Sequence, residues 1–219
     1  MSVVLLSILS MLWPPPDPPV SERWHAWPVS RVFPQFVHGA SPSGARITYV
    51  LAGVAPEAPC RTAFQPAAVR RGCRVALRAT YADSTQTFVA TVGVAVLDPP
   101  EPEAPERETP VIDTPGSGVP GSGTSRSGTS GSRRSARASY RTGRPPTVRP
   151  VAFPGGPAER FGRRQYVTGV VIEGQDHYLV ATAAGYADGR PYRRGDRAMP
   201  RLRATARQLA TALHRALTR

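Results

Sequence analysis

The sequence predicts an α+β domain in which an antiparallel sheet, built from two hairpins, has two helices packed on it. Three observations support this class. Pairs of β-branched segments joined by short polar turns occur twice, an amphipathic helical segment ends the chain, and a long Pro-, Gly-, Ser- and Arg-rich stretch interrupts the pattern. The chain has 219 residues with 25 Pro and 20 Gly, which suits one domain plus irregular segments.

The first half of the domain is predicted over 31–98. "RITYVLAG" (46–53) alternates in polarity and is β-branched, which is typical of a strand. "PEAPCRTAFQPAAVRRG" (56–72) is rich in alanine and ends on Gly72, so it predicts a short helix that is interrupted or restarted at Pro66.

A hairpin follows that helix. "CRVALRATYA" (73–82) and "QTFVATVGVAVL" (86–97) predict two strands, and the polar residues 83–85 between them form the turn.

The second half is predicted over 150–219. It begins with "VAFPGG" and continues with a hairpin made of 163–174 and 177–190. A helix is expected over 200–217, with Pro200 in its first turn. Its apolar face consists of Leu202, Ala206, Leu209, Leu213 and Leu217. Since each half has only about 70 residues, which is marginal for a separate core, we expect both halves to form one sheet.

Residues 99–149 form the predicted linker between the halves. They are acidic and Pro-rich at first, then Gly/Ser-rich, and finally Arg-rich. Such a composition buries too little apolar area to offset the ordering entropy, so we expect this linker to be disordered.

The amino terminus predicts membrane attachment. Residues 1–13 are apolar and uncharged, but a spanning helix needs about 20 apolar residues. We interpret 1–13 as part of a truncated membrane anchor; the alternative is a short helix of a cytoplasmic protein. The Pro-rich residues 14–30 are expected to form an extended juxtamembrane stalk.

Cys60 and Cys73 are the two cysteines of the chain. A zinc site needs about four ligands, and no second Cys pair or suitably spaced His accompanies them. Two readings remain, a disulfide worth about 3 kcal/mol in the chain-entropy model, or two small buried thiols in a reducing cytosol. Disulfides persist outside the cytosol, and the apolar leader favours export, so we expect a disulfide.

The net charge of +13 is concentrated in the second part of the chain. Residues 1–125 carry nine Arg against ten acids, whereas 126–219 carry 19 Arg against five acids. This asymmetry suits an anionic partner, although the absence of Lys and Asn indicates a GC-rich genome that favours Arg codons. The candidate contacts for an anionic partner are Arg133, Arg134, Arg137, Arg141 and Arg144.

Several short segments match known binding or catalytic motifs but lack the structural context that those motifs require. "GSGVPG" (116–121) matches a dinucleotide-binding pattern without the strand and helix that pattern requires, and "RGD" (194–196) is short enough to arise by chance. Asp83, Ser84 and His177 all fall at predicted hairpin tips, which allows an Asp83–His177 or Ser84–His177 pair without favouring one. We therefore assign no catalytic, cofactor-binding or metal-binding residue.

"RITYVLAGVAPEAPC", "RATYADSTQTFVATVGVAVL" and "ATAAGYADGR" resemble segments of uncharacterised membrane-anchored, exported proteins of high-GC actinobacteria. The resemblance covers both predicted halves and leaves out the linker. It implies an exported domain held by a single-pass anchor, and it implies no activity.

These features lead to three hypotheses. The favoured one is a non-enzymatic, membrane-anchored extracytoplasmic module that binds a protein or an anionic cell-envelope polymer. The second is a nucleic-acid-associated protein that uses the Arg-rich half, which is disfavoured because no nucleic-acid-binding fold is visible. The third is an enzyme of unrecognised type.

Overall fold

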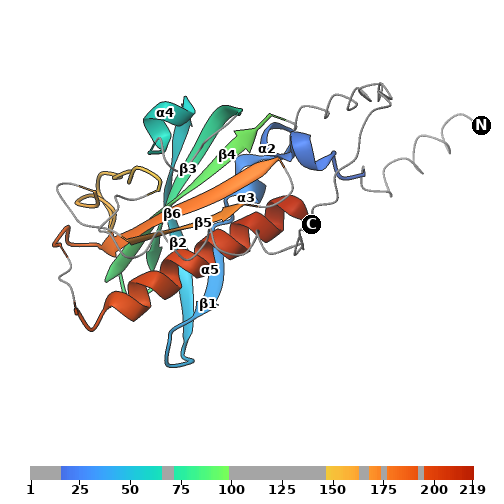
Figure 1. The fold of residues 1–219 in the computed structure, drawn as a ribbon. Coiled ribbons are helices and arrows are strands. Elements are labelled where there is room, and N and C mark those ends of the chain that lie inside the picture. The colour runs from blue at the N-terminus through green and yellow to red at the C-terminus, as the bar shows by residue number, and fades with distance from the viewer. Residues whose placement is uncertain (1–15, 66–71, 99–146, 163–167, 174–176, 192–194) are drawn as a thin grey trace, which may run out of the picture. The chain divides into compact units, whose positions relative to one another are not determined.

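The computed structural model describes residues 16–65, 72–98, 147–162, 168–173, 177–191 and 195–219 (Figure 1). Over these ranges the chain forms an antiparallel sheet with helices packed on it, so the predicted α+β class is confirmed. The strands are β1 (Phe36–Ala40), β2 (Arg46–Ala58), β3 (Cys73–Asp83), β4 (Phe88–Leu97), β5 (Thr168–Glu173) and β6 (Tyr178–Tyr186).

The six strands lie in the order β1-β2-β3-β4-β6-β5, and each neighbouring pair is antiparallel. The two predicted hairpins are present as β3–β4 and β5–β6. Strand β4 pairs with β6 along its length, from Phe88 opposite Tyr186 to Val96 opposite Tyr178. The two halves of the sequence therefore contribute to the same sheet. Strand β1 was not predicted, because its five residues are too few to show a clear alternation.

Helix α5 (Met199–Thr218) confirms the predicted C-terminal helix and lies across β5 and β6 on one side of the sheet (Figure 1). The predicted apolar face is the buried face of the helix, and Leu209 is fully buried. We call this side of the sheet the helix face. Its core contains Val92, Val94, Tyr49, Tyr81, Tyr178, Tyr186 and the α5 leucines.

The amino-terminal segment corrects a prediction. Residues 14–30 were expected to be extended, but the described part folds into η1 (Val20–Glu22), α2 (Arg23–Ala26) and α3 (Val29–Val32). The prolines permit this because Pro19 and Pro28 occupy N-cap positions, where no amide donor is needed.

These short helices dock on the helix face near the end of α5. Arg23 is buried, and its Nη1 donates a hydrogen bond to the Leu217 carbonyl oxygen at 2.9 Å. Trp27 is also buried, with the Arg31 guanidinium 3.9 Å from its ring centroid. The segment is thus part of the folded core, which its proline content concealed.

The opposite side of the sheet, which we call the loop face, is covered by α4 (Cys60–Ala63) and by residues 147–162. Its core residues are Ala63, Phe64, Ala76, Ala95, Val148, Ala158, Phe161 and Leu179. Phe64 forms an isolated bridge with Val148, and the Arg149 amide donates to the Ala63 carbonyl oxygen at 2.8 Å. Irregular segments here take the place that α5 occupies on the helix face.

The helix predicted over 56–72 is wrong in extent. Residues 56–58 continue strand β2, and the helix is the single turn of α4. A register shift between Ala55 and Ala58 accommodates Pro56 within the strand, as β-bulges often do for proline. Residues 66–71 lie outside the described ranges.

Within the described ranges, no helix has both the length and the apolar character needed to cross a bilayer. The predicted anchor (1–13) lies outside those ranges. So does the predicted disordered linker, apart from 147–149, which belong to the loop face.

Candidate functional site

A groove of about 460 Å³ opens at one end of the sheet, where three segments distant in sequence meet. The segments are the β1–β2 turn with the start of β2, the β3–β4 turn, and the start of α5. Each of the first and third supplies arginine, so Arg46, Arg197 and Arg201 all line the groove. We call it the arginine groove. Its lining also contains four hydroxyl residues, Ser41, Ser43, Ser84 and Thr85.

None of the three arginines forms an ion pair with a carboxylate of the described residues. The ion pairs between described residues join Arg31 to Asp17, Arg74 to Asp98 and Arg190 to Asp188, and none of these residues lines the groove. Arg201 instead lies over the Phe88 ring, 5.1 Å from its centroid. All three groove arginines are exposed. With three guanidinium groups and one carboxylate among its described lining residues, the groove carries an excess of positive charge.

Asp83 is the carboxylate that lines the groove, but its oxygens are engaged in the β3–β4 turn. Oδ1 accepts the Thr87 and Phe88 amides at 2.8 and 3.0 Å, and Oδ2 accepts the Thr85 hydroxyl at 2.7 Å. The residue is 2 % exposed. Asp83 thus shapes the turn, and it leaves the exposed arginines free for a ligand.

The β1–β2 turn is held by its own serines. The Ala45 amide donates to Ser41 Oγ at 3.0 Å, and Ser41 Oγ lies 2.8 Å from Ser43 Oγ. Gly44 has φ of +85°, a conformation that favours glycine. These contacts place Arg46 at the first position of β2, facing the groove.

The start of α5 is fixed by Asp196. Its Oδ1 accepts the Ala198 amide at 3.0 Å, and its Oδ2 accepts the Tyr186 hydroxyl at 2.8 Å. This anchors the loop that carries Arg197 to the end of β6. The positive end of the α5 dipole lies beside the same arginines, which adds to the local positive potential.

Tyr49 lies on the helix face near the groove. Its hydroxyl donates to Gln208 Oε1 at 3.0 Å and lies 3.3 Å from Thr205 Oγ1. Burial raises the pKa of Tyr49, and the Asp83 carboxylate raises it further, while the Thr205 hydroxyl and Arg201 oppose the change. The phenol therefore stays neutral near pH 7 and serves the fold.

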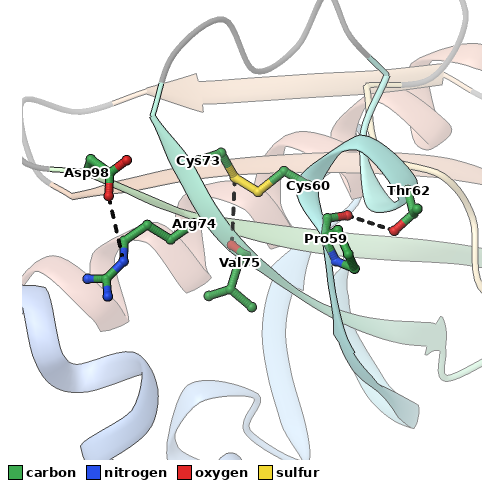
Figure 2. Close-up of a disulfide and its surroundings, with 7 residues drawn as sticks. All are labelled: Pro59, Cys60, Thr62, Cys73, Arg74, Val75 and Asp98. Atoms are coloured by element: carbon green, nitrogen blue, oxygen red, sulfur yellow. Dashed lines mark hydrogen bonds and ion pairs between the residues drawn. A yellow bond between two sulfur atoms is a disulfide. The ribbon is translucent and has the colours of Figure 1, made fainter.

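Cys60 and Cys73 form the predicted disulfide, with their Cα atoms 6.1 Å apart (Figure 2). Cys60 begins α4 and Cys73 begins β3, so the bond ties the loop-face turn to the sheet. Beside it, Arg74 and Asp98 form an exposed ion pair at 3.6 Å. The groove lies at the other end of β3, where Asp83 is its last residue.

The structure places His177 far from Asp83 and Ser84, although the sequence allowed it to meet either of them. The Leu97 amide donates to the His177 carbonyl oxygen, whereas Asp83 accepts the amide of Phe88. His177 and Asp83 thus lie at opposite ends of β4, about 30 Å apart at ~3.3 Å per residue. The Asp83–His177 and Ser84–His177 constellations are therefore wrong.

The remaining candidates fall outside the described residues. These are the linker arginines Arg133, Arg134, Arg137, Arg141 and Arg144, the "GSGVPG" segment and Arg194 of "RGD". Among the residues that the structure describes, no three His, Cys, Asp or Glu side chains are grouped to hold a metal ion.

Sequence reasoning missed the arginine groove. Arg46 and Arg201 are 155 positions apart, and no local motif connects them. The only usable signal was that two of the predicted element ends carry arginine near serine or proline and a third carries serine and threonine, which does not say that those ends meet. Comparison of the chain with protein-family models, with curated proteins and with solved structures gives no match.

Proposed function

We propose that this protein is a membrane-anchored extracytoplasmic module that binds a protein or an anionic cell-envelope polymer and has no catalytic role. The observation that carries the proposal is the Cys60–Cys73 disulfide, since such bonds persist in oxidising compartments and are rare in the cytosol. The apolar residues 1–13 support attachment to a membrane.

The arginine groove supports a binding role for an anionic partner. Its guanidinium groups are exposed and have no carboxylate partner among the described residues, so they are available to a ligand. The segments that carry Arg46 and Arg197 are held by internal hydrogen bonds, which limits the entropy lost on binding.

The location is tested by thiol chemistry in cells. The full chain, carrying a carboxy-terminal tag, is expressed in a bacterial host, its free thiols are trapped by acid quenching, and a maleimide mass tag is added under denaturing conditions. We expect no tag before reduction and two tags after it, with the protein in the membrane fraction and its folded part digested by protease added to intact spheroplasts.

Two control variants sharpen that experiment. Cys60→Ser should give one tag without reduction, which calibrates the assay. Deletion of 2–13 should release the protein from the membrane fraction. Two tags on the unreduced wild type, together with a soluble and protease-protected protein, would contradict the proposal.

A further inference from the structure

We propose that the arginine groove binds consecutive phosphate groups of a phosphodiester polymer of the cell envelope. This inference rests on the proposed function and names the chemistry of the partner. It assigns Arg46, Arg197 and Arg201 as the contacts, in place of the linker arginines.

The donors of the groove suit phosphate. A guanidinium group offers planar pairs of N–H donors that match two oxygens of a phosphate. Ser43 and Ser84 add exposed hydroxyl donors beside those arginines. Phosphate presents its oxygens in several directions and can accept from both kinds of donor at once, whereas a carboxylate is flat and has two oxygens.

The exposure of the arginines favours a chain of phosphates over a single one. An exposed ion pair changes affinity by less than about fivefold, because water screens it. One inorganic phosphate would therefore bind weakly at Arg46, Arg197 or Arg201. A polymer that reaches all three arginines combines their contributions, since each further contact becomes intramolecular after the first.

The lining argues against single-stranded nucleic acid as the polymer. Proteins that bind such strands stack the bases on aromatic side chains, and each stacked base contributes strongly to affinity. Among the residues that the structure describes, the groove is lined by Ser, Pro, Ala, Arg, Ile, Asp and Thr, without Phe, Tyr, Trp or His. A phosphodiester polymer without bases has nothing to stack, so the lack of aromatic side chains does not weaken its binding.

The test uses the full, oxidised chain and a fluorescently labelled poly(glycerol phosphate), with binding followed by anisotropy. The groove variant is R46Q/R197Q/R201Q. Its matched control is R203Q/R207Q/R215Q, which removes the same charge from exposed positions of α5 that do not line the groove. A third variant replaces Arg133, Arg134, Arg137, Arg141 and Arg144 by Gln.

We expect the groove variant to bind the polymer at least about tenfold more weakly than wild type, and the α5 control to bind within about twofold. The slope of log affinity against log salt concentration should be smaller in magnitude by about 2 in the groove variant, because three phosphate contacts that contribute ~0.7 each are removed. R46K/R197K/R201K keeps the charge but lacks the paired donors, so it should lie between wild type and the groove variant.

Several results would overturn the inference. One is an equal loss in the groove variant and its α5 control, which would mean that net charge alone binds the polymer. Another is a loss confined to the linker variant. Binding of an oligo(dT) with the same number of phosphates, or of polyglutamate with the same number of charges, as tightly as poly(glycerol phosphate) would also reject it. Because the assay uses purified protein, these failures are distinct from a failure of the thiol and protease tests of location.

Discussion

The two faces of the sheet are covered in different ways. On the helix face, a twenty-residue helix buries a row of leucines against four tyrosines and several valines. On the loop face, a single helical turn and the irregular residues 147–162 cover a surface made largely of alanine. The helix face thus relies on large apolar side chains, while the loop face has smaller ones and adds the Cys60–Cys73 disulfide.

The difference indicates how an irregular segment is kept in place. Fixing irregular backbone costs entropy, and it gains no regular ladder of hydrogen bonds in return. On the loop face, the disulfide limits the freedom of the unfolded chain, and the Phe64–Val148 bridge ties the two covering segments together. The two faces should therefore respond to different perturbations.

Truncation on the helix face should have the largest effect. Leu209→Ala removes a fully buried side chain between α5 and the sheet, and we expect it to lower the free energy of unfolding by about 3–5 kcal/mol. Urea denaturation followed by tyrosine fluorescence measures the change. Arg207→Ala, on the exposed side of the same helix, should change stability by less than about 0.5 kcal/mol. Equal losses in both variants would mean that α5 does not depend on its apolar face.

Removal of the disulfide should perturb the loop face first. Cys60→Ser/Cys73→Ser is expected to cost about 3 kcal/mol, because the unfolded chain regains the freedom of a closed loop of fourteen residues. In hydrogen-exchange measurements, the amides of Phe64 and Arg149 should lose protection before the amides of α5 do. Uniform loss across both faces would show that the disulfide stabilises the sheet as a whole.

Alkaline pH should destabilise the protein through the buried tyrosines of the helix face. Burial raises the pKa of Tyr49, Tyr81, Tyr178 and Tyr186, all of which lie in the helix-face core. A phenol whose pKa is higher in the folded state contributes stability that is complete below the ordinary pKa near 10 and declines above it. The urea midpoint should fall as the pH rises beyond about 10.

Tyr81→Phe tests that assignment. It removes the hydrogen bond from the Tyr81 hydroxyl to the Pro34 carbonyl oxygen at 3.1 Å, which should cost about 1 kcal/mol at pH 8. The same variant should lose less stability than wild type between neutral and alkaline pH, since one titrating phenol is gone. A pH dependence identical to that of wild type would exclude Tyr81 from the effect.

Elements with a local signal were predicted well. Both hairpins are pairs of largely apolar, β-prone segments around short polar turns, and α5 repeats its apolar residues at helical spacing, so each pattern is visible locally in the sequence. The helix expected over 56–72 shows where local signals mislead. Its alanines favour a helix, yet strand pairing extends through Ala58, because tertiary contacts override a weak propensity.

The disulfide and the arginine groove also differ in how much of each the local sequence could predict. The Cys60–Cys73 bond joins neighbours in sequence, and residue counting with an argument about compartment was enough to expect it. The arginine groove depends on two turns and the start of α5, which the sheet brings together, and no residue near Arg46 indicates that Arg201 lies close by. Its discovery required the fold.

Taken by itself, the sequence determined the α+β class, both hairpins, the C-terminal helix and the cysteine pairing, because the information for each lies within a few turns or strands of chain. Only the tertiary structure decided that β4 pairs with β6, that Arg23 and Trp27 are buried, that 147–162 cover the loop face, and that three arginines share a groove. Those features come from contacts between residues that are far apart along the chain, and such contacts leave no periodic trace in local sequence.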